Sequence, residues 1–487
     1  MIYTAKSPVR PTPDEFKKLA SEGIYTVVPV SCELFADIRT PIEVLKILKS
    51  VSSRCFLLES VIGGERWGRY TFLGFDPKLE VTCTAGKMTV GDAVFRTSSP
   101  SKHIRRLLEG YRSPRLDYLP PFTGGLVGYF AYDYIKYAEP TLRLDALDDE
   151  GFRDVDLMLF DRIIAFDNLR QKMVLVASAE PTAEGYERAV AQLDKMCRLV
   201  TDGSPITDTG GAVTGEFRAL FDREGYCELV ELAKHHIREG DIRQIVLSNR
   251  FDAPFEGSLL DTYRRLRTIN PSPYMFYLSS PELEVAGASP ETLVKLQDGV
   301  LRTFPLAGSR PRGKTPDEDA ALERELLADP KELSEHNMLV DLGKSDLGKV
   351  SVIGSVDVEE LRTVVRYSHI MHISSTVRGV IRPGCDAFDA VEAVLPAGTL
   401  SGAPKLRACQ LINELEGCRR GLYGGAIGYI DFTGNLDTCI AIRLAYKKNG
   451  RVYVRSGAGI VADSVPEREH EECKNKAAAL LAALKEE

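Results

Sequence analysis

The stretch DPKELSEHNMLVDLGKSDLGKV, residues 329–350, predicts a helix that carries acidic side chains on one face. Asp329 is a favourable N-cap, and Pro330 suits the first helical position, where its missing N–H costs nothing. Glu332 and Glu335 are three residues apart, so their carboxylates share one face about a turn apart. On its own such a pair is more often a solvated acidic face than a site, because Glu is a good helix former.

A second acidic helix strengthens the case for a site. The segment DSVPEREHEECKNKAAALLAAL, residues 463–484, opens with an S-x-x-E capping box at Ser464. Glu469 and Glu472 are again three apart, and Lys476 follows Glu472 by four residues. Mg²⁺ takes one or two carboxylates directly and keeps waters and substrate oxygens. If the two helices meet, their carboxylate pairs predict a magnesium site.

Length and composition limit the function classes. The 487 residues allow two or three domains or one large intertwined unit, and 44% hydrophobic residues are ordinary for a globular core. The net charge of −8, with no basic tail, argues against a nucleic-acid partner. We expect no secretory signal and no membrane span, since long apolar runs are absent. The ten cysteines are scattered, which indicates reduced thiols in a cytoplasmic protein.

One polar segment divides the chain. Residues 201–217, TDGSPITDTGGAVTGEF, predict a linker or surface excursion between a β-rich part, residues 1–200, and a larger part, residues 218–487. Residues 157–179 predict a hairpin made by LMLFDRIIAFD and KMVLVASA. Strands and helices occur in blocks and do not alternate as βαβ units. We therefore expect an α+β fold of large, mostly antiparallel sheets packed with helices, in two intertwined subdomains.

Several motifs of the larger part suit an anionic ligand. PAGTLSGAPK, residues 396–405, places Thr399 just before a helix start whose free N–H groups attract anions, although an ordinary capped helix is the alternative. In SGAG, residues 456–459, glycines let a ligand oxygen reach the backbone. Arg443 is expected mid-strand, where it needs an anion or an acidic partner. His372 is either a core histidine or an acid or base. This inventory suits an enzyme that handles a small polycarboxylate with Mg²⁺.

A nucleotide-binding motif has to be considered as well. GSRPRGKT, residues 308–315, matches the P-loop pattern G-x-x-x-x-G-K-[ST]. In a P-loop the Lys and Thr lie inside the first helical turn. Here Pro316 disfavours the helical conformation for Thr315, and Thr315 with Glu318 forms a capping box that starts the helix later. A nucleotide-binding protein is therefore a weak alternative.

Motifs along nearly the whole chain resemble the chorismate-utilising enzymes, and among them the large subunits that form anthranilate. They are GDIRQIVLSNRF at 240–251, NPSPYMFYL, PLAGSRPRG, YSHIMH, PAGTLSGAPK, YGGAIGY, DTCIAIR, and GAGIVADS followed by E-x-x-E-x-x-N-K. LLES and ERWGRYTFLG extend the resemblance towards the N-terminus. It implies the chorismate-utilising fold, a regulatory role for residues 1–200 and a chorismate-binding catalytic domain over residues 218–487.

The resemblance also implies roles for individual residues. Mg²⁺ would be bound directly by Glu335 and Glu472, and through waters by Glu332 and Glu469. The implied substrate-binding residues are Thr399, Tyr423, Arg443, Gly457, Gly459 and Lys476, and the implied catalytic residues are His372, Gln244 and Thr399. The implied reaction adds ammonia to the chorismate ring with loss of the ring hydroxyl, and then eliminates pyruvate to leave anthranilate.

Two positions separate this branch from its siblings. Ala307 lies where the aminodeoxychorismate synthases carry a Lys nucleophile, which disfavours that alternative. Gln244 lies where isochorismate and salicylate synthases carry a Lys that activates water, and a neutral amide fits ammonia as the nucleophile. A catalytically inactive scaffold is a further alternative, against which the presence of all four glutamates, His372 and Arg443 argues.

A partner and an inhibitor are implied too. No cysteine lies in a G-x-C-x-G nucleophile turn, so we expect ammonia from a separate glutamine amidotransferase subunit, in a hetero-oligomer. Feedback inhibition by tryptophan is implied, in a pocket of Glu59, Ser60, Pro273, Tyr274, Met275 and Cys439. Plain core packing is the alternative for Met275 and Cys439. A carboxylate such as Glu59, at the end of an apolar strand, suits an amino group.

Overall fold

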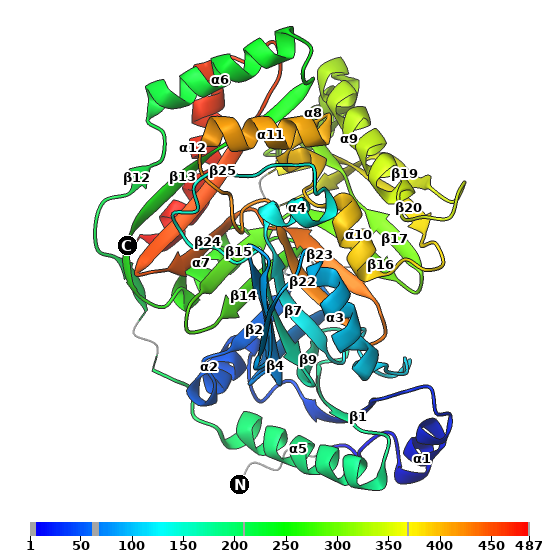
Figure 1. Ribbon diagram of the computed structural model, residues 1–487. Helices are drawn as coiled ribbons and strands as arrows, with labels where there is room; N and C mark the ends of the chain where they lie inside the picture. The colour runs from blue at the N-terminus through cyan, green and yellow to red at the C-terminus, as the bar shows by residue number, and fades with distance from the viewer. Residues whose placement is uncertain (1–5, 61–67, 208–209, 368–369, 486–487) are drawn as a thin grey trace.

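The computed structural model describes residues 6–60, 68–207, 210–367 and 370–485. The start of the ERWGRYTFLG motif (residues 65–67), part of YSHIMH (368–369) and two residues of the expected linker (208–209) lie outside the described residues. The described chain folds into two large sheets with helices around them (Figure 1). Every named strand pairing is antiparallel, so the predicted α+β class with large antiparallel sheets is confirmed.

The first sheet runs through strands from both ends of the chain. Its order is β1 (Val28–Phe35), β10 (Lys172–Ala179), β9 (Arg162–Asp167), β3 (Tyr70–Phe75), β2 (Cys55–Glu59), β14 (Tyr274–Ser279), β15 (Glu284–Ser289), β24 (Leu444–Lys448), β25 (Arg451–Ile460), β13 (Gln244–Gly257) and β11 (Gly211–Val213). Two short strands, β12 (Arg218–Ala219) and β21 (Gly402–Ala403), also pair with β13.

The second sheet is assembled in the same way. Its order is β18 (Leu306–Pro311), β20 (Ile370–Val380), β17 (Val300–Thr303), β16 (Thr292–Gln297), β23 (Leu436–Ile440), β22 (Ala426–Asp431), β7 (Gly125–Phe130), β8 (Val155–Phe160), β4 (Leu79–Thr84), β5 (Lys87–Val90) and β6 (Ala93–Arg96), with β19 (Asp357–Arg366) also on β20.

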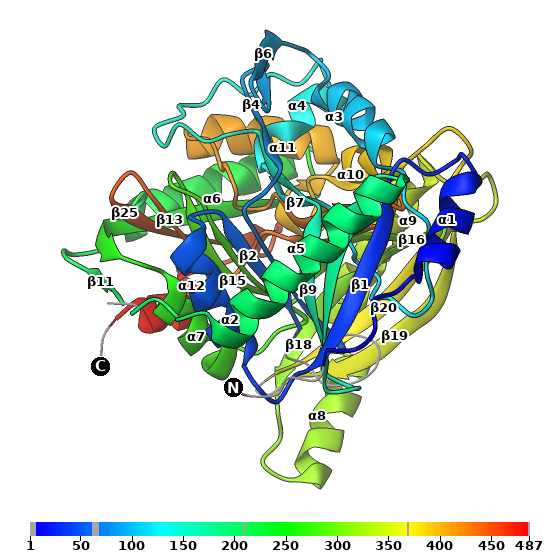
Figure 2. The ribbon, with the colours of Figure 1, turned by 90° about the horizontal axis from the view of Figure 1, so that it is seen from below.

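The helices lie around the sheets, with α5 crossing the lower side and α8 projecting from the body in Figure 2. Their bounds are α1 (Pro13–Ser21), α2 (Pro41–Val51), α3 (Pro100–Leu108), α4 (Ile135–Ala138), α5 (Ala183–Asp202), α6 (Arg223–Arg238), α7 (Leu260–Ile269), α8 (Pro316–Ala328), α9 (Pro330–Gly348), α10 (Ala387–Val394), α11 (Lys405–Glu416) and α12 (Pro466–Leu484), with short 3₁₀ turns η1 (Glu109–Tyr111), η2 (Tyr132–Tyr134) and η3 (Gly398–Leu400).

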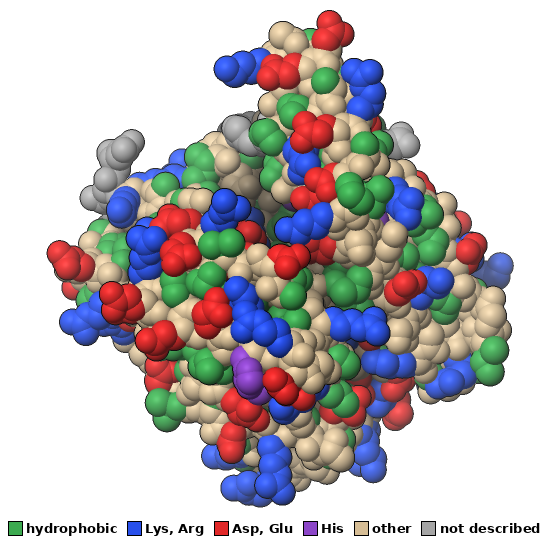
Figure 3. All heavy atoms as spheres, turned by 90° about the horizontal axis from the view of Figure 1, so that it is seen from above, with side chains coloured by type: hydrophobic (Ala, Val, Ile, Leu, Met, Phe, Trp, Pro, Cys, Tyr) green, Lys and Arg blue, Asp and Glu red, His purple; other side chains and the backbone are tan. Residues whose placement is uncertain are grey.

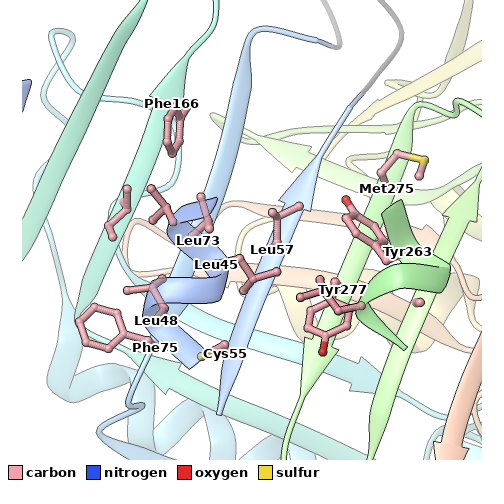
Figure 4. Close-up of a cluster of buried hydrophobic side chains, with 14 of the residues drawn as sticks. Leu45, Leu48, Cys55, Leu57, Leu73, Phe75, Phe166, Tyr263, Met275 and Tyr277 are labelled. Carbon is pink, nitrogen blue, oxygen red and sulfur yellow. The ribbon is translucent and has the colours of Figure 1, made fainter. Parts of the chain in front are cut away.

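Alternation along the strands builds two cores on opposite faces of the first sheet. Phe56 of β2 points to the second sheet, and its ring centre lies 4.8 Å from that of Phe160 in β8. Its neighbour Leu57 points the other way and packs with Leu45 and Leu48 of α2 (Figure 4). All five side chains are buried, so the aromatic layer between the sheets and the aliphatic layer under α2 are both interior.

Each sheet contains strands that precede residues 201–217 in the sequence and strands that follow them. β2 pairs with β14 in the first sheet, and β7 pairs with β22 in the second. β11, which lies inside the expected linker, pairs with β13. The segment therefore separates the two parts along the chain but not in space, and the predicted intertwining is confirmed. The regulatory and catalytic labels of the two parts stay predictions.

The hairpin predicted over residues 157–179 is wrong in one respect. β9 and β10 form a hairpin in the first sheet, but β8 belongs to the second sheet. The run LMLFDRIIAFD is thus two strands that separate at Asp161. Both halves are apolar and strand-forming, so local sequence carries no signal of the change of sheet.

The predicted helix starts have mixed outcomes. The Asp329 carboxylate accepts hydrogen bonds from the backbone N–H groups of Lys331 and Glu332, as predicted for the N-cap of α9. The capping box predicted at Ser464 is wrong. Its hydroxyl accepts from Val461 N at 3.1 Å in the preceding turn, and α12 starts after Val465 without a side-chain cap.

The GSRPRGKT segment is a strand and a turn. β18 covers its first residues, and Thr315 caps α8 by accepting from Glu318 N at 3.2 Å. The Lys and Thr of the pattern therefore lie before the helix and not inside its first turn. This geometry removes the reason for a phosphate-binding loop at this place.

The surface seen from above carries both signs of charge. Lys and Arg side chains are interspersed with Asp and Glu, and hydrophobic side chains appear only in small groups (Figure 3). Among the described helices, none has the length and apolar content needed to cross a bilayer.

Candidate active site at the crossing between the two sheets

The chain passes between the sheets at two neighbouring points. Glu291 lies in the crossing from β15 to β16, and Arg443 lies in the crossing from β23 to β24. Backbone hydrogen bonds join the crossings, because Ile440 N donates to Glu291 O and Ala288 N donates to Arg443 O, each at 3.0 Å. The prediction of Arg443 within a strand is wrong, since its φ of 53° is left-handed. The turn at Arg443 accompanies the change of sheet, and the backbone hydrogen bonds hold the two crossings side by side.

Helix α12 adds a second cation. The Lys476 ammonium donates to the Glu472 carboxylate at 2.6 Å and to Gly457 O at 3.1 Å. The Arg443 guanidinium donates to the backbone carbonyl of Lys476 at 2.8 Å. Burial lowers the pKa of Arg443, while Tyr423 and Glu472 oppose that effect. Two cations are thus held where β25, α12 and the second crossing meet.

The glycines of β25 make room for two of the predicted site residues. A Cβ on Gly457 would lie 3.0 Å from the Tyr423 hydroxyl and 2.7 Å from Leu247 O. A Cβ on Gly459 would lie 3.1 Å from Nε2 of Gln244. The backbone contact at Gly457 is too short for a side chain, and at Gly459 the Gln244 amide would have to move by a few tenths of an ångström. The structure therefore brings Gln244, Tyr423 and both glycines together at one end of β25.

The carboxylates of α9 and α12 act on one another. Burial raises the pKa of Glu335, and the charges of Glu332 and Glu472 raise it further. Burial also raises the pKa of Glu469, with Glu472 adding to the effect. The two acidic helix faces are therefore close enough to repel each other, and the charges of Lys331 and Lys476 oppose the rise in the pKa of both Glu335 and Glu469.

These carboxylates fit a magnesium ion in their chemistry. Among the described residues no three Asp, Glu, His or Cys side chains are grouped tightly enough to form a complete metal site. Mg²⁺ does not need such a cage, because it takes one or two carboxylates and completes its octahedron with waters and substrate oxygens. A divalent cation between α9 and α12 would also remove the repulsion that raises the pKa of Glu335.

His372 faces the same region in its neutral form. Its Nδ1 lies 3.1 Å from Gly308 O, and since a carbonyl only accepts, Nδ1 carries the proton and Nε2 can accept one. Burial lowers the pKa of His372, and the cations Arg443 and Lys476 lower it further, against the effect of the Gly308 hydrogen bond. The imidazole is thus available as a base near neutral pH.

Glu291 is a functional candidate that the sequence analysis missed. Burial raises the pKa of its carboxyl to about 8, which the hydrogen bond from Thr399 and the charge of Lys476 only partly oppose. The Thr399 hydroxyl donates to Oε1 of Glu291 at 3.2 Å. The signal was a single acidic residue in GASPETLVKL, between two stretches that form buried strands. Its carboxyl is protonated near neutral pH, which suits a proton donor.

A cavity of about 440 Å³ opens between the sheets, next to this region. All six residues predicted for the tryptophan pocket line it: Glu59, Ser60, Pro273, Tyr274, Met275 and Cys439. The Ser60 hydroxyl is buried and has no hydrogen-bond partner in the described part of the chain. Glu59 accepts from the Tyr263 hydroxyl at 2.6 Å and from Arg267 at 3.2 Å, so α7 already holds this carboxylate.

One wall of the cavity reaches the first crossing. The Tyr274 hydroxyl lies 2.9 Å from Oγ1 of Thr292 and donates to Oδ1 of Asp437 at 2.9 Å. Thr292 directly follows Glu291, and it pairs with Cys439 across β16 and β23. Tyr274 of the cavity wall therefore contacts the residue that directly follows the buried Glu291 in the chain.

Comparison with known proteins adds the family. A family model described as chorismate binding enzyme matches residues 53–482. The chain belongs to this family. This chorismate-binding enzyme is 44% identical over 490 residues to anthranilate synthase component 1 of Acetivibrio thermocellus, with 98% of both chains covered. It is 44% identical over 486 residues to anthranilate synthase component 1 of Pseudomonas aeruginosa, covering 97% of this chain and 98% of that protein.

A solved structure agrees with these relatives. Anthranilate synthase component I from Streptococcus pneumoniae superimposes with a TM-score of 0.77 at 34% identity, covering 86% of this chain and 95% of that chain. The predicted family and the chorismate-utilising fold are therefore confirmed. The roles of the individual site residues in this chorismate-binding enzyme, and its cytoplasmic location, stay predictions.

Proposed function

We propose that the chain is the large subunit of an anthranilate synthase, which converts chorismate and ammonia to anthranilate and pyruvate. The observation that carries this proposal is the meeting of two cations, Arg443 and Lys476, with the protonated Glu291 and the neutral His372 at the crossing between the sheets. Cations bind the carboxylates of a dianionic substrate, and a paired acid and base serve its two eliminations.

The first half-reaction makes a C–N bond. Arg443 and Lys476 hold the carboxylates of chorismate, with Tyr423, Thr399 and the β25 glycines Gly457 and Gly459 around them. Ammonia attacks the ring beside the neutral amide of Gln244. The ring hydroxyl departs as water on receiving the proton of Glu291, and the new C–NH₃⁺ group gives a proton back to the Glu291 carboxylate, which leaves aminodeoxyisochorismate. Thr399 keeps the Glu291 carboxyl oriented through its 3.2 Å hydrogen bond.

The second half-reaction restores aromaticity. Nε2 of His372 takes the ring proton from the carbon that carries the new amino group, and the bond between the ring and the enolpyruvyl oxygen breaks. The departing group is the enolate of pyruvate, which takes up a proton at carbon to become pyruvate, and anthranilate remains. The 3.1 Å contact of Nδ1 with Gly308 O holds the imidazole in the tautomer that this step needs.

Mg²⁺ is the proposed cofactor. Glu335 and Glu472 would bind it directly, with Glu332 and Glu469 acting through waters. When bound, it would offset negative charge on the ring carboxylate as a Lewis acid. The oxygen-only donor set and the raised pKa of Glu335 support this assignment.

The ammonia is proposed to come from glutamine through a separate amidotransferase subunit, in a hetero-oligomer. The sequence has no G-x-C-x-G nucleophile turn of its own, and the relatives carry the name component 1, which implies a second component. The remaining alternative is an aminodeoxychorismate synthase, which Ala307 disfavours because a methyl group cannot act as the nucleophile. Ala307 lies in β18 opposite Ile373.

The cavity between the sheets is proposed to bind tryptophan as a feedback inhibitor. The aromatic and apolar residues Tyr274, Met275 and Cys439 would surround the indole. The Ser60 hydroxyl, which has no partner among the described residues, would offer a hydrogen bond to the amino acid. We expect S60A to weaken inhibition by tryptophan with little effect on the uninhibited rate. Unchanged inhibition curves would remove Ser60 from the site.

One assay tests the catalytic proposal. The purified chain is incubated with chorismate, Mg²⁺ and ammonium at raised pH, and anthranilate is followed by fluorescence and mass. We expect anthranilate with ammonium, none with glutamine alone, and none from E472Q. An aminodeoxychorismate product, or full activity of E472Q, would contradict the proposal.

A further inference from the structure

A fully buried ion pair lies behind the candidate active site. Glu416 ends α11, and Arg420 follows in the next turn, with 3% and 1% of their surfaces exposed. Nε of Arg420 donates to Oε2 of Glu416 at 2.9 Å, and Nη2 donates to Oε1, so the contact is bidentate. Burial of two charges away from water is costly, and a pair of well-packed apolar residues often serves stability as well. The pair therefore calls for a role besides stability.

The pair joins two segments that carry proposed site residues. Nη1 of Arg420 donates to Leu400 O at 2.6 Å, and Nη2 donates to Val246 O at 2.7 Å. Leu400 follows Thr399 in η3, and Val246 lies two residues after Gln244 in β13. A single guanidinium thus fixes the distance between the turn that holds Thr399 and the strand that holds Gln244.

Glu416, the acidic partner of the pair, also binds strand β13. Oε1 of Glu416 accepts from both the backbone N–H of Ser248 at 2.7 Å and its hydroxyl at 3.0 Å. These bonds hold β13 just beyond the residue that Arg420 contacts. The strand that carries Gln244 is thus bound to the pair at two places.

Two further site segments touch the pair. The Arg420 guanidinium lies 5.7 Å from the ring centre of Tyr423, and the backbone N–H of Tyr423 donates to Arg420 O at 3.2 Å. Arg455 of β25 places Nη2 3.7 Å from Oε2 of Glu416, two residues before Gly457. Four segments of the site therefore meet at one buried carboxylate and one guanidinium.

We propose that the Arg420–Glu416 pair is a positioning element that sets Thr399 and Gln244 relative to each other for the reaction. This inference rests on the anthranilate synthase activity proposed above. Within the described residues, the hydrogen bonds of the two side chains go to the turn and the strand and not to Arg443 or Lys476, so the pair acts through the turn and the strand. The planar fork of arginine is essential, since its nitrogens serve Glu416, Leu400 and Val246 at the same time.

The test uses R420K, which keeps the charge and loses the fork. Because misplacement by about 1 Å can cost 10²-fold in rate, we expect kcat with ammonium to fall by about tenfold or more. The KM for chorismate should change by less than about threefold, because Arg443 and Lys476 bind the substrate independently of the pair. R250K is the matched control. Arg250 is a buried arginine of β13, the strand that carries Gln244, and its guanidinium binds Asp149 in a bidentate contact and also binds Glu150. The kcat of R250K should not change.

A double variant separates positioning from stability. E416Q/R420M removes both buried charges and keeps an acceptor for Ser248, so it should melt cooperatively near the wild-type temperature and still show the low kcat. Wild-type kcat in a folded R420K, or recovery of both stability and kcat in the double variant, would overturn the inference. If neither R420K nor E416Q/R420M folds, the pair serves stability alone, and the inference is overturned as well. An inactive wild type would instead refute the proposed function.

Discussion

Glu291 is an acid that burial keeps protonated near neutral pH, and His372 is a base that burial keeps neutral; the charge of Lys476 acts on both. E291Q preserves the shape and the acceptor for the Thr399 hydroxyl but has no proton to donate. We expect its kcat with ammonium to fall by about 10²–10⁴-fold, the usual contribution of a general acid, with a small change in the KM for chorismate. Steady-state kinetics measure both. A kcat within threefold of wild type would exclude Glu291 as the proton donor.

The same residue makes stability depend on pH. The pKa of Glu291 is about 8 in the folded chain and 4.5 as an ordinary Glu, so between these values the folded state holds a proton that the unfolded state releases. Stability from this group therefore falls as pH rises from about 4.5 to about 8. E291Q lacks the effect, so its Tm relative to wild type should rise over that window and level off above it. A constant difference in thermal melts would contradict the assignment.

Tyr274 lines the cavity and forms a hydrogen bond with the first residue after Glu291. Its hydroxyl lies 2.9 Å from Thr292, the neighbour of Glu291. We expect Y274F to bind tryptophan with similar affinity, because the ring stays in place, and to be inhibited less completely at saturation. Calorimetry and inhibition curves measure the two effects separately. Equal loss of binding and inhibition would mean that Tyr274 only contacts the ligand.

Helix starts carry the next prediction. D329A removes the cap of α9, and T315A removes the cap of α8, so each should lower the free energy of unfolding by about 1 kcal/mol. Only α9 carries Glu332 and Glu335. D329A should therefore also raise the Mg²⁺ concentration needed for half-maximal activity, and T315A should not. An equal Mg²⁺ shift in both variants would show a general effect of destabilisation.

The elements also mark how far the sequence could be interpreted. Helix starts with Pro at the first position, such as α2 and α9, were predictable because a cap is a local interaction. The crossings at Asp161 and Arg443 were not, because membership in a sheet depends on partners distant along the chain. The role of Glu291 was missed for that reason: only the crossing shows that its carboxyl is buried beside Thr399.

Two shared sheets make the whole molecule one folding unit. A chain cut between residues 207 and 210 would leave the β2 edge without β14, and β7 without β22. We expect fragments 1–207 and 210–487 to be poorly folded alone, because each exposes long unpaired strand edges and half of an aromatic core. Mixed during refolding, they should recover a cooperative melt and anthranilate formation. A fragment that melts cooperatively alone would contradict this view.

The positions of the proposed metal-binding and substrate-binding residues depend on the same two shared sheets. The carboxylates of α9 and α12 were predictable as pairs from helical spacing, and their mutual effect on the pKa of Glu335 agrees with that expectation. What spacing could not supply is the cavity between the sheets, since its walls come from β2 and β14 on one side and β16, β22 and β23 on the other. Its lining residues entered the sequence analysis only through family resemblance.

Strands β2 and β14 form one wall of that cavity, and for a strain engineer who wants to relieve the proposed inhibition by tryptophan they have unequal value. On β14, the Tyr274 hydroxyl lies 2.9 Å from Thr292, the neighbour of Glu291, so we expect substitutions there that weaken the proposed inhibitor binding to slow the enzyme as well. Directly after β2, the buried Ser60 hydroxyl has no hydrogen-bond partner among the described residues. Libraries of substitutions at Ser60 and its neighbours in β2 should yield enzymes that tryptophan inhibits less and that keep their uninhibited rate.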